Sequence, residues 1–585
     1  MRRLGLFGWL LTLSCAFAQI NHSPRQPVLE KDVAIPMRDG VLLRADLLRP
    51  SDEGRFPVLV YRTPYGKEFA LREYTTFKKA VERGYAVVVQ DVRGRYASDG
   101  EFRPYQNEGR DGYDTIEWAA RQTWSDGDIG TFGLSYPGAV QWLAAVEDPP
   151  HLKAMVPAMT FSTPQNFFYS HGLWDLSWIE WIWDNIAPDV RIKKNLPGPK
   201  TYQQATTAWE QAGPKMLAAV PLNQLEELRG IAPYYYDWLS HPPEDPWWDW
   251  CELRNRYARV HAAVLNLSGW YDDNYGPEGA ATNFSGLVNA RRGQSEAHTH
   301  LLLGPWVHGV QSTQTFHAGD REFGPDAAID FDEVVLRWMD HYVRSSANGV
   351  ENEAPVRYFV MGSNQWRDAQ NWPPPAQQSS YYLTSADKGS SGRLTTGIAR
   401  AQSPPTSFIS SPAEPVSNPY SSSGAHDYRQ LTARKDVLTF DSAPLERDLE
   451  VTGPIHADIY LSCDCPDTDL FTRLLDVAPD GTAFNLMSPG LDAQRASYRN
   501  LSKGHQLLEP GRIYELHLDD LLTSNVFLKG HRIRLQVSAT FFPNFSRNLH
   551  TGESEAVAAK MQKANISIYV DRQHPSKLVL PVVTR

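Results

Sequence analysis

The sequence predicts an α/β protein with a mostly parallel sheet, interrupted by an aromatic-rich helical insertion and followed by an all-β domain. Short, nearly continuous apolar runs alternate with helix-like segments early in the chain and resume after residue 260. Between these regions tryptophan and tyrosine are dense, and beyond residue 354 apolar residues alternate with polar ones. Alternating strands and helices are typical of parallel sheets, whereas period-two alternation is typical of antiparallel sandwiches.

The first 18 residues are predicted to be a signal peptide. Two arginines precede an apolar run that ends at Ala16-Phe17-Ala18, the small-x-small pattern of a secretory cleavage site. We therefore expect the mature protein to be secreted or periplasmic. Cys15 raises lipidation as an alternative, although Thr12 stands where a lipoprotein signal has an aliphatic residue.

The elements of the α/β part follow in order. Two alternating runs around Arg38-Asp39-Gly40 predict a hairpin over residues 33–50. A helix is expected over residues 111–121. Buried strands are predicted at residues 57–62, 85–92, 128–133, 153–159, 262–270 and 299–306. We therefore assign residues 19–160 and 251–353 to one split domain.

The inserted segment, residues 161–250, is predicted to be a helical cap. Trp174, Trp178 and Trp181 fall at i, i+4, i+7 spacing, which indicates one helix face. This stripe fits a packing surface, and it also fits a lid whose aromatics line a pocket. On the second interpretation Tyr169, Trp174 and Trp181 are candidate substrate-binding residues.

Residues 354–585 are predicted to form a β-sandwich or jelly roll. Loops rich in proline, serine and glycine occupy residues 373–425, and alternating strands with frequent turn signals follow.

Composition excludes several classes of function. The chain has 585 residues and a formal charge of -11, which argues against a nucleic-acid partner. No run beyond the signal approaches the roughly 20 apolar residues of a membrane helix, so no membrane association is expected. The sequence gives no indication of the oligomeric state.

No cofactor or metal is expected. The three cysteines outside the signal are too few for a disulfide framework. Cys463 and Cys465 are expected to face the same side of a strand-like run. We favour their interpretation as small buried side chains over a metal-binding pair, because further metal ligands are missing. The same lack of ligands argues against a zinc site at His298 and His300.

The segment G-T-F-G-L-S-Y-P-G-A-V-Q-W, residues 130–142, resembles a nucleophile elbow with a displaced second glycine. Gly133 precedes Ser135 by two residues, but Pro137 occupies the usual place of the second glycine and Gly138 follows it. Proline is tolerated in the first turn of a helix, and it leaves the backbone N–H of Tyr136 intact. That N–H is the expected first oxyanion donor.

Two later strand ends offer the partners that a serine nucleophile needs. His308 follows the strand at residues 299–306, and Asp272 follows the one at residues 262–270, with Asp273 as a competing acid. The order Ser, Asp, His along the chain is that of the α/β-hydrolases. A second oxyanion donor is expected from the loop after the early strand at residues 57–62. The hydroxyl of Tyr65 in that loop is a candidate.

Several motifs together resemble the cocaine esterase family of serine hydrolases. They are G-L-S-Y-P-G, R-T-P-Y-G-K, Q-D-V-R-G-R-Y-A-S-D-G, S-G-W-Y-D, G-P-W-V-H, V-M-G-S-N-Q-W-R and T-S-N-V-F-L-K-G-H-R-I-R. This family is related to X-prolyl dipeptidyl aminopeptidases, α-amino acid ester hydrolases and glutaryl cephalosporin acylases. The resemblance covers nearly the whole mature chain.

The resemblance implies an α/β-hydrolase core with an inserted helical cap and a C-terminal jelly roll. It also implies Ser135 as nucleophile, His308 as base, Asp272 as orienting acid, and the Tyr136 N–H and Tyr65 hydroxyl as oxyanion hole. We therefore expect a secreted serine hydrolase that cleaves carboxylic esters, with amides as further substrates, and whose partner is that small molecule.

Two other functions compete with this one. An X-prolyl dipeptidyl aminopeptidase or α-amino acid ester hydrolase on the same scaffold would bind a free amine, for which Asp273 and Glu278 are candidate carboxylates. A non-catalytic, glycan-binding secreted protein is the alternative from another class. In the resembling family the acid is followed by glycine or isoleucine and an aromatic, whereas this chain has Asp273-Asn274, which indicates a more polar mouth.

Overall fold

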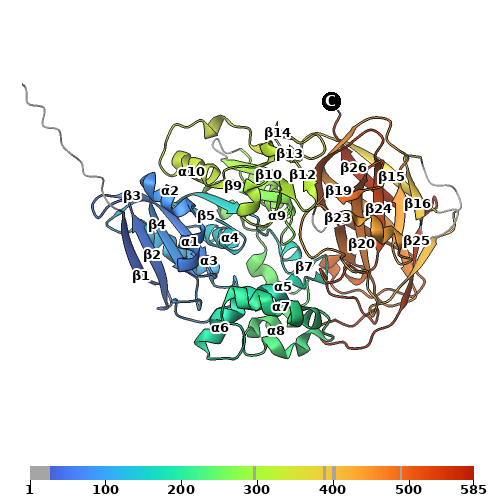
Figure 1. The fold of residues 1–585 in the computed structure, drawn as a ribbon, viewed down its shortest axis with the longest axis horizontal. Coiled ribbons are helices and arrows are strands. Elements are labelled where there is room, and N and C mark those ends of the chain that lie inside the picture. The colour runs from blue at the N-terminus through green and yellow to red at the C-terminus, as the bar shows by residue number, and fades with distance from the viewer. Residues whose placement is uncertain (1–26, 294–297, 386–390, 398–402, 488–490, 585) are drawn as a thin grey trace, which may run out of the picture.

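The computed structural model describes residues 27–293, 298–385, 391–397, 403–487 and 491–584. The predicted signal peptide lies outside these residues. Figure 1 shows the α/β part at the left, the all-β part at the right and the helical cap along the lower edge between them. Across the described ranges, none of the helices combines the length and apolarity that crossing a membrane requires.

A ten-stranded sheet forms the centre of the α/β part, in the order β1-β2-β4-β3-β5-β6-β9-β10-β13-β14. Its strands are β1 Val28–Pro36, β2 Leu42–Arg49, β3 Phe56–Thr63, β4 Ala86–Asp91, β5 Ser125–Leu134, β6 Leu152–Ala158, β9 Ala263–Tyr271, β10 Thr299–Val307, β13 Val356–Val360 and β14 Gln365–Ala369. Neighbours from β4 to β13 pair in parallel, and the outer pairs are antiparallel. The predicted hairpin and parallel strands are confirmed.

Helices cover both faces of this sheet, which explains the continuous apolar runs. They are α1 Lys67–Glu73, α2 Thr76–Glu82, α3 Glu108–Ala120, α4 Tyr136–Ala145, α9 Glu278–Ala290 and α10 Phe331–Tyr342. Helices α2 and α10 contribute Phe77 and Leu336 to the core on one face, while α3 and α4 contribute Ile116 and Val140 to the other. Strand β4 is buried along its whole length as a result.

The sheet extends further along the chain than the predicted boundary at residue 353. Strand β13 pairs in parallel with β10, Leu301 facing Val356, and β14 then closes the edge. Strands β13 and β14 form an antiparallel hairpin, whose sequence pattern matches the β domain that follows.

The cap contains α5 Ser177–Trp181, a π-helical turn Ile182–Ile186, α6 Ala187–Lys193, α7 Tyr202–Leu217 and α8 Pro233–Ser240. The expectation that Trp174, Trp178 and Trp181 share one helix is wrong. Trp174 lies in β8 (Leu173–Trp174), which pairs with β7 (Tyr169–Ser170), and only the other two tryptophans lie in α5. Gly172, at φ 94°, permits the tight turn between these short strands.

The C-terminal part is all-β, as predicted. Its strands are β15 Gln377–Thr384, β16 Ser391–Thr395, β17 Thr406–Ser410, β18 Leu438–Asp441, β19 Leu449–Cys463, β20 Asp469–Val477, β21 Ala483–Asn485, β22 Leu491–Arg495, β23 Tyr514–Phe527, β24 Arg532–Ser538, β25 Ala564–Tyr569 and β26 Lys577–Val582. Met361 joins this part to the α/β sheet, since its N–H donates to Ser524 (3.0 Å) and its carbonyl accepts from Val526 (2.8 Å).

Candidate active site

Ser135 lies at the sharp turn between β5 and α4, with φ 67° and ψ −128°. A non-glycine residue with positive φ is strained, and such strain is typical of nucleophile elbows. A Cβ on Gly133 would lie 2.5 Å from Cβ of Pro137, and one on Gly138 would lie 2.6 Å from the carbonyl oxygen of Ala158 in β6. The displaced glycine therefore has a physical reason: it is residue 138 that approaches the neighbouring strand.

His308 and Asp272 meet at the carboxyl ends of β10 and β9. Nδ1 of His308 lies 2.9 Å from Oδ1 of Asp272, which is fully buried and also accepts the N–H of Asn274 at 3.1 Å. Burial disfavours the charged imidazole, but the charge and hydrogen bond of Asp272 outweigh it and raise the pKa of His308. The pair is therefore arranged to hold a proton on the imidazole.

The phenols of Tyr65 and Tyr275 lie within interaction range of the Ser135 hydroxyl. Among the described residues, no hydrogen bond joins Ser135 to His308. Hydrogen bonds of catalytic groups are often long without substrate and tighten when it binds.

Tyr65 follows β3, in a loop where its N–H donates to Oγ1 of Thr63 at 3.1 Å. Its phenolic oxygen accepts a hydrogen bond of 3.1 Å from Nε1 of Trp181 in the cap. Burial raises the pKa of Tyr65 to about 12, so the phenol stays protonated at neutral pH. A protonated phenol beside a nucleophile can donate to a developing oxyanion.

Tyr136 is the first residue of α4, where a backbone N–H has no partner within the helix. Its side chain anchors it: the ring stacks on Tyr105 at 4.0 Å, and the hydroxyl donates to Oε1 of Glu108 at 2.9 Å. Glu108 in turn pairs with Arg62 at 2.7 Å inside the core. This network fixes the residue whose N–H is the candidate oxyanion donor.

Arg95, in the Q-D-V-R-G-R segment, connects the loop of Tyr65 with the cap. The fully buried guanidinium donates to the carbonyls of Pro64 (2.8 Å), Asn185 (3.0 Å) and Ile186 (3.0 Å) and lies 3.3 Å from Asp189. The arginine therefore has a structural role.

Comparison with known proteins supports a single family. Residues 39–310 match the model of the X-Pro dipeptidyl-peptidase (S15 family), and residues 348–579 match the C-terminal non-catalytic domain of X-Pro dipeptidyl-peptidases. The chain is 34% identical to the cocaine esterase of Rhodococcus sp. (strain MB1 Bresler), over 95% of this chain and 98% of that protein. The chain belongs to this family of serine hydrolases.

Two solved structures share the fold. An α-amino acid ester hydrolase superposes with a TM-score of 0.81 at 23% identity, covering 97% of this chain and 100% of that one. An aminopeptidase from the marine sediment archaeon Thaumarchaeota archaeon superposes with a TM-score of 0.80 at 22% identity, covering 96% and 97%. The predicted resemblance and its fold are thus confirmed, and the protein is an enzyme rather than a non-catalytic binding protein.

Within this family fold, a small cavity of about 100 Å³ adjoins the acid loop. Carboxylates dominate its polar lining: Asp175, Asp272, Asp273, Glu278 and Asp492. Burial raises the pKa of Asp175 to about 7. Burial also raises the pKa of Asp273, which reaches solvent within this recess and accepts a hydrogen bond from Ser423 of the β domain. The recess is therefore polar and acidic.

The aromatic candidates for substrate binding occupy different positions. Tyr169 borders the same cavity and donates to the carbonyl of His241 at 2.8 Å. Trp174 is fully buried in the cap, packed against Tyr169, and does not line the cavity. Trp181 contacts Tyr65 and stacks on Tyr136 with an interplanar angle of 7°. Trp181 thus borders both candidate oxyanion donors.

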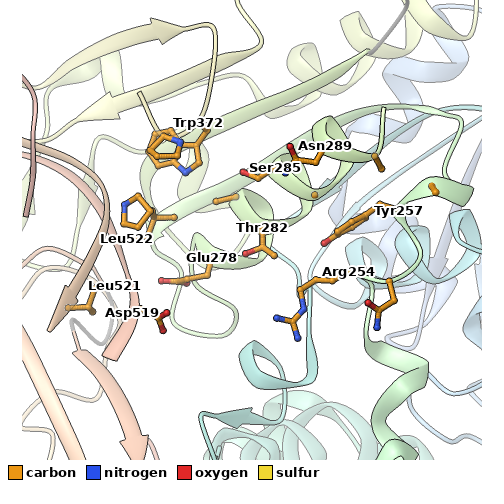
Figure 2. A pocket seen from close by; sticks show the side chains of 17 residues that line it. Arg254, Tyr257, Glu278, Thr282, Ser285, Asn289, Trp372, Asp519, Leu521 and Leu522 are labelled. Carbon is orange, nitrogen blue, oxygen red and sulfur yellow. The ribbon is translucent and has the colours of Figure 1, made fainter. Parts of the chain in front are cut away.

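A roomier cavity of about 740 Å³ lies between α9 and the β domain (Figure 2). Its lining includes Thr282 and Ser285 of α9 on one side and Trp372 and Leu522 on the other, and none of the three triad candidates. Glu278 borders both cavities. Pocket size alone would therefore point away from the serine, which the cap covers closely.

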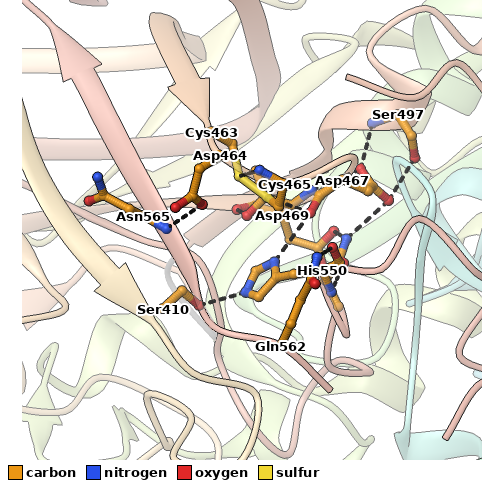
Figure 3. Close-up of a disulfide and its surroundings, with 12 residues drawn as sticks. Ser410, Cys463, Asp464, Cys465, Asp467, Asp469, Ser497, His550, Gln562 and Asn565 are labelled. Carbon is orange, nitrogen blue, oxygen red and sulfur yellow. Dashed lines mark hydrogen bonds between the residues drawn. A yellow bond between two sulfur atoms is a disulfide. The ribbon is translucent and has the colours of Figure 1, made fainter. Parts of the chain in front are cut away.

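Cys463 and Cys465 form a disulfide at the end of β19 (Figure 3). We expected buried side chains facing one way, and the structure buries both but bonds them to each other. In the part of the chain described here, these cysteines and Asp464 are the one group of three potential metal ligands that converge. Because the sulfurs are bonded together, they are not available as thiolate ligands.

His298 and His300 take part in aromatic packing. Nδ1 of His298 lies 3.2 Å from the hydroxyl of Tyr342, and the ring of His300 packs at 5.0 Å from Trp338. Burial lowers the pKa of His300 to about 4, which keeps it neutral.

Sequence reasoning missed two contributors to the site. Tyr275 reaches Ser135 from the acid loop, and Trp181 acts on Tyr65 rather than on a pocket wall. The signal for Tyr275 is present in the G-W-Y-D-D-N-Y segment, where a tyrosine follows the acid by three residues. Spacing in a loop, however, does not encode the direction in which a side chain points.

Proposed function

We propose that this protein is a serine esterase that works through an acyl-enzyme on Ser135. The observation that carries the proposal is the buried Asp272–His308 pair at the strand ends next to a strained serine. Family membership supports it, because the related protein from Rhodococcus is a cocaine esterase.

The reaction proceeds in two halves. Oγ of Ser135 attacks the ester carbonyl while its proton passes to Nε2 of His308, and the carbonyl oxygen takes the negative charge. The Tyr136 N–H and the Tyr65 hydroxyl donate to that oxyanion. The alcohol leaves with the proton from His308, which next accepts a proton from water as the water attacks the acyl group. Asp272 holds the imidazole in the required tautomer throughout.

Labelling with a fluorophosphonate tests the nucleophile. Ser135→Ala is expected to abolish both labelling and ester turnover, whereas Ser407→Ala, which changes an exposed serine in β17, leaves both intact. Labelling of Ser135→Ala at another serine overturns the assignment.

A second candidate function is hydrolysis of esters or amides that carry a free α-amine. The acidic lining around Asp175 and Asp273 favours it, since carboxylates gathered in a recess attract a cation. Two solved structures with this fold are named an α-amino acid ester hydrolase and an aminopeptidase. Matched ester substrates with free and acetylated amines separate the functions, because only an amine-dependent enzyme loses kcat/KM strongly on acetylation.

We also propose that the enzyme is exported. The signal pattern over residues 1–18 supports this, and a disulfide is favoured in oxidising compartments. N-terminal sequencing of the mature protein is expected to begin at Gln19. A mature protein in the cytosol that retains residues 1–18 contradicts export, and acylation at Cys15 indicates the lipoprotein alternative.

A further inference from the structure

Tyr275 lies three residues after Asp272 and reaches the nucleophile from the acid loop. Its side chain is only 8% exposed, its ring packs 5.8 Å from that of His308, and its hydroxyl lies within interaction range of Ser135. It also borders the small acidic cavity. The phenol is thus next to the reacting atoms.

A second buried phenol stands behind this one. The hydroxyls of Tyr275 and Tyr105 are 3.3 Å apart, and Tyr105 is 1% exposed. In the residues that the structure describes, the Tyr105 hydroxyl has no other hydrogen bond. A phenol has one proton to donate, so when Tyr105 donates to Tyr275, the Tyr275 proton is free to point at Ser135.

The same arrangement occurs at Tyr65. The indole of Trp181 has only a donor, so the oxygen of Tyr65 must accept, and its own proton is directed elsewhere. Trp181 can only donate to Tyr65, and Tyr105 is able to donate to Tyr275. Once Ser135 is acylated its oxygen has no proton, and each phenol can then act only as a donor.

We propose that Tyr275 is a catalytic residue whose hydroxyl donates a hydrogen bond to Oγ of Ser135 as the bond between that oxygen and the acyl carbon forms and breaks. This rests on Ser135 being the nucleophile. The Tyr65 hydroxyl and the Tyr136 N–H donate to the carbonyl oxygen of the substrate, whereas the Tyr275 hydroxyl donates to Oγ of Ser135.

The proton balance is unchanged by this hydrogen bond. In acylation the Ser135 proton passes to His308 as the electron pair of Oγ forms the new bond. In deacylation water gives its proton to His308, the bond to Oγ breaks, and the electron pair returns to Oγ with the proton from His308. Tyr275 keeps its proton, because burial raises its pKa far above the ordinary value.

Tyr275→Phe tests the proposal with p-nitrophenyl acetate as substrate. We expect kcat to fall roughly 10- to 100-fold with little change in KM, a smaller loss than the about 10²- to 10³-fold typical of an oxyanion-hole donor. Stopped-flow measurement is expected to show both acylation and deacylation slowed, because both make or break the bond at Oγ. Tyr382→Phe, in β15 of the β domain, is the matched control and keeps wild-type kcat.

Tyr105→Phe gives an independent test, because it leaves Tyr275 in place and removes the donor behind it. We expect an intermediate loss of kcat, and no further loss when it is combined with Tyr275→Phe. Wild-type kcat in Tyr275→Phe overturns the inference, and so does a change confined to KM.

Failure of the proposed function gives a different result. If fluorophosphonate does not label Ser135 in the wild-type enzyme, the nucleophile is wrong. If it labels Ser135 in wild type and in Tyr275→Phe while kcat is unchanged, the nucleophile stands and the role of Tyr275 is wrong.

Discussion

Nε1 of Trp181 donates a hydrogen bond of 3.1 Å to the phenolic oxygen of Tyr65, across the boundary between cap and hydrolase core. The indole comes from the last residue of α5, directly before the π-helical turn Ile182–Ile186. Arg95 strengthens the same boundary by binding both the Tyr65 loop and the carbonyls of that turn. The cap therefore helps to position the hydroxyl that we propose as an oxyanion donor.

Removal of the Tyr65 hydroxyl tests its role as a donor. Tyr65→Phe is expected to lower kcat by roughly 10²- to 10³-fold, because the oxyanion loses one preorganised hydrogen bond. Steady-state kinetics on an uncharged ester measure this. Wild-type kcat would remove Tyr65 from the mechanism.

Trp181→Phe is expected to have a weaker effect in the same direction. It keeps an aromatic ring on Tyr136 but removes the indole donor, and the loss of one neutral hydrogen bond corresponds to roughly a 2- to 10-fold drop in kcat. In a background of Tyr65→Phe, the same change is expected to have little effect. Additive losses in the double variant would show that Trp181 acts through substrate contact instead.

The pH profile should reflect His308. A general base must be neutral to accept the serine proton, and Asp272 raises the pKa of His308, so kcat/KM is lost as pH falls through a value above the ordinary pKa of histidine, about 6.5. Asp272→Asn is expected to move this loss of kcat/KM to lower pH and to reduce kcat about 10⁴-fold. An unchanged pH profile in the variant argues against the pairing of Asp272 with His308.

Gly138→Ala should disturb the elbow through sterics alone. Its Cβ would lie 2.6 Å from the Ala158 carbonyl, a backbone atom that cannot rotate away, and overpacking of this kind costs about 1–3 kcal/mol. Thermal unfolding is expected to show a lower Tm together with lower activity. Gly397→Ala is the control, because a Cβ there meets nothing within 4 Å; an equal Tm in both variants would contradict the argument.

The sequence predicts the sheet well because burial on both faces leaves continuous apolar runs such as that of β4. It places Ser135, Asp272 and His308 at strand ends for the same reason, and the structure brings the last two together. The positions of Trp174 and Tyr275 could not be predicted from the sequence. Trp174 lies in a hairpin, which interrupts the helical spacing of the tryptophans. The direction of the Tyr275 side chain is set by a loop that packs against His308 and Tyr105.

The parallel pairing of β6 with β9 joins segments that flank the entire cap, with Ala154 opposite Ala263. During translation, the ribosome therefore releases the elbow and the Tyr65 loop well before the acid and the base exist. A nascent chain that ends within the cap contains Ser135 but not yet His308. Under the proposed function, hydrolytic activity requires that β9 and β10 have joined the sheet, so we expect an incomplete chain to be inert while it is still being made.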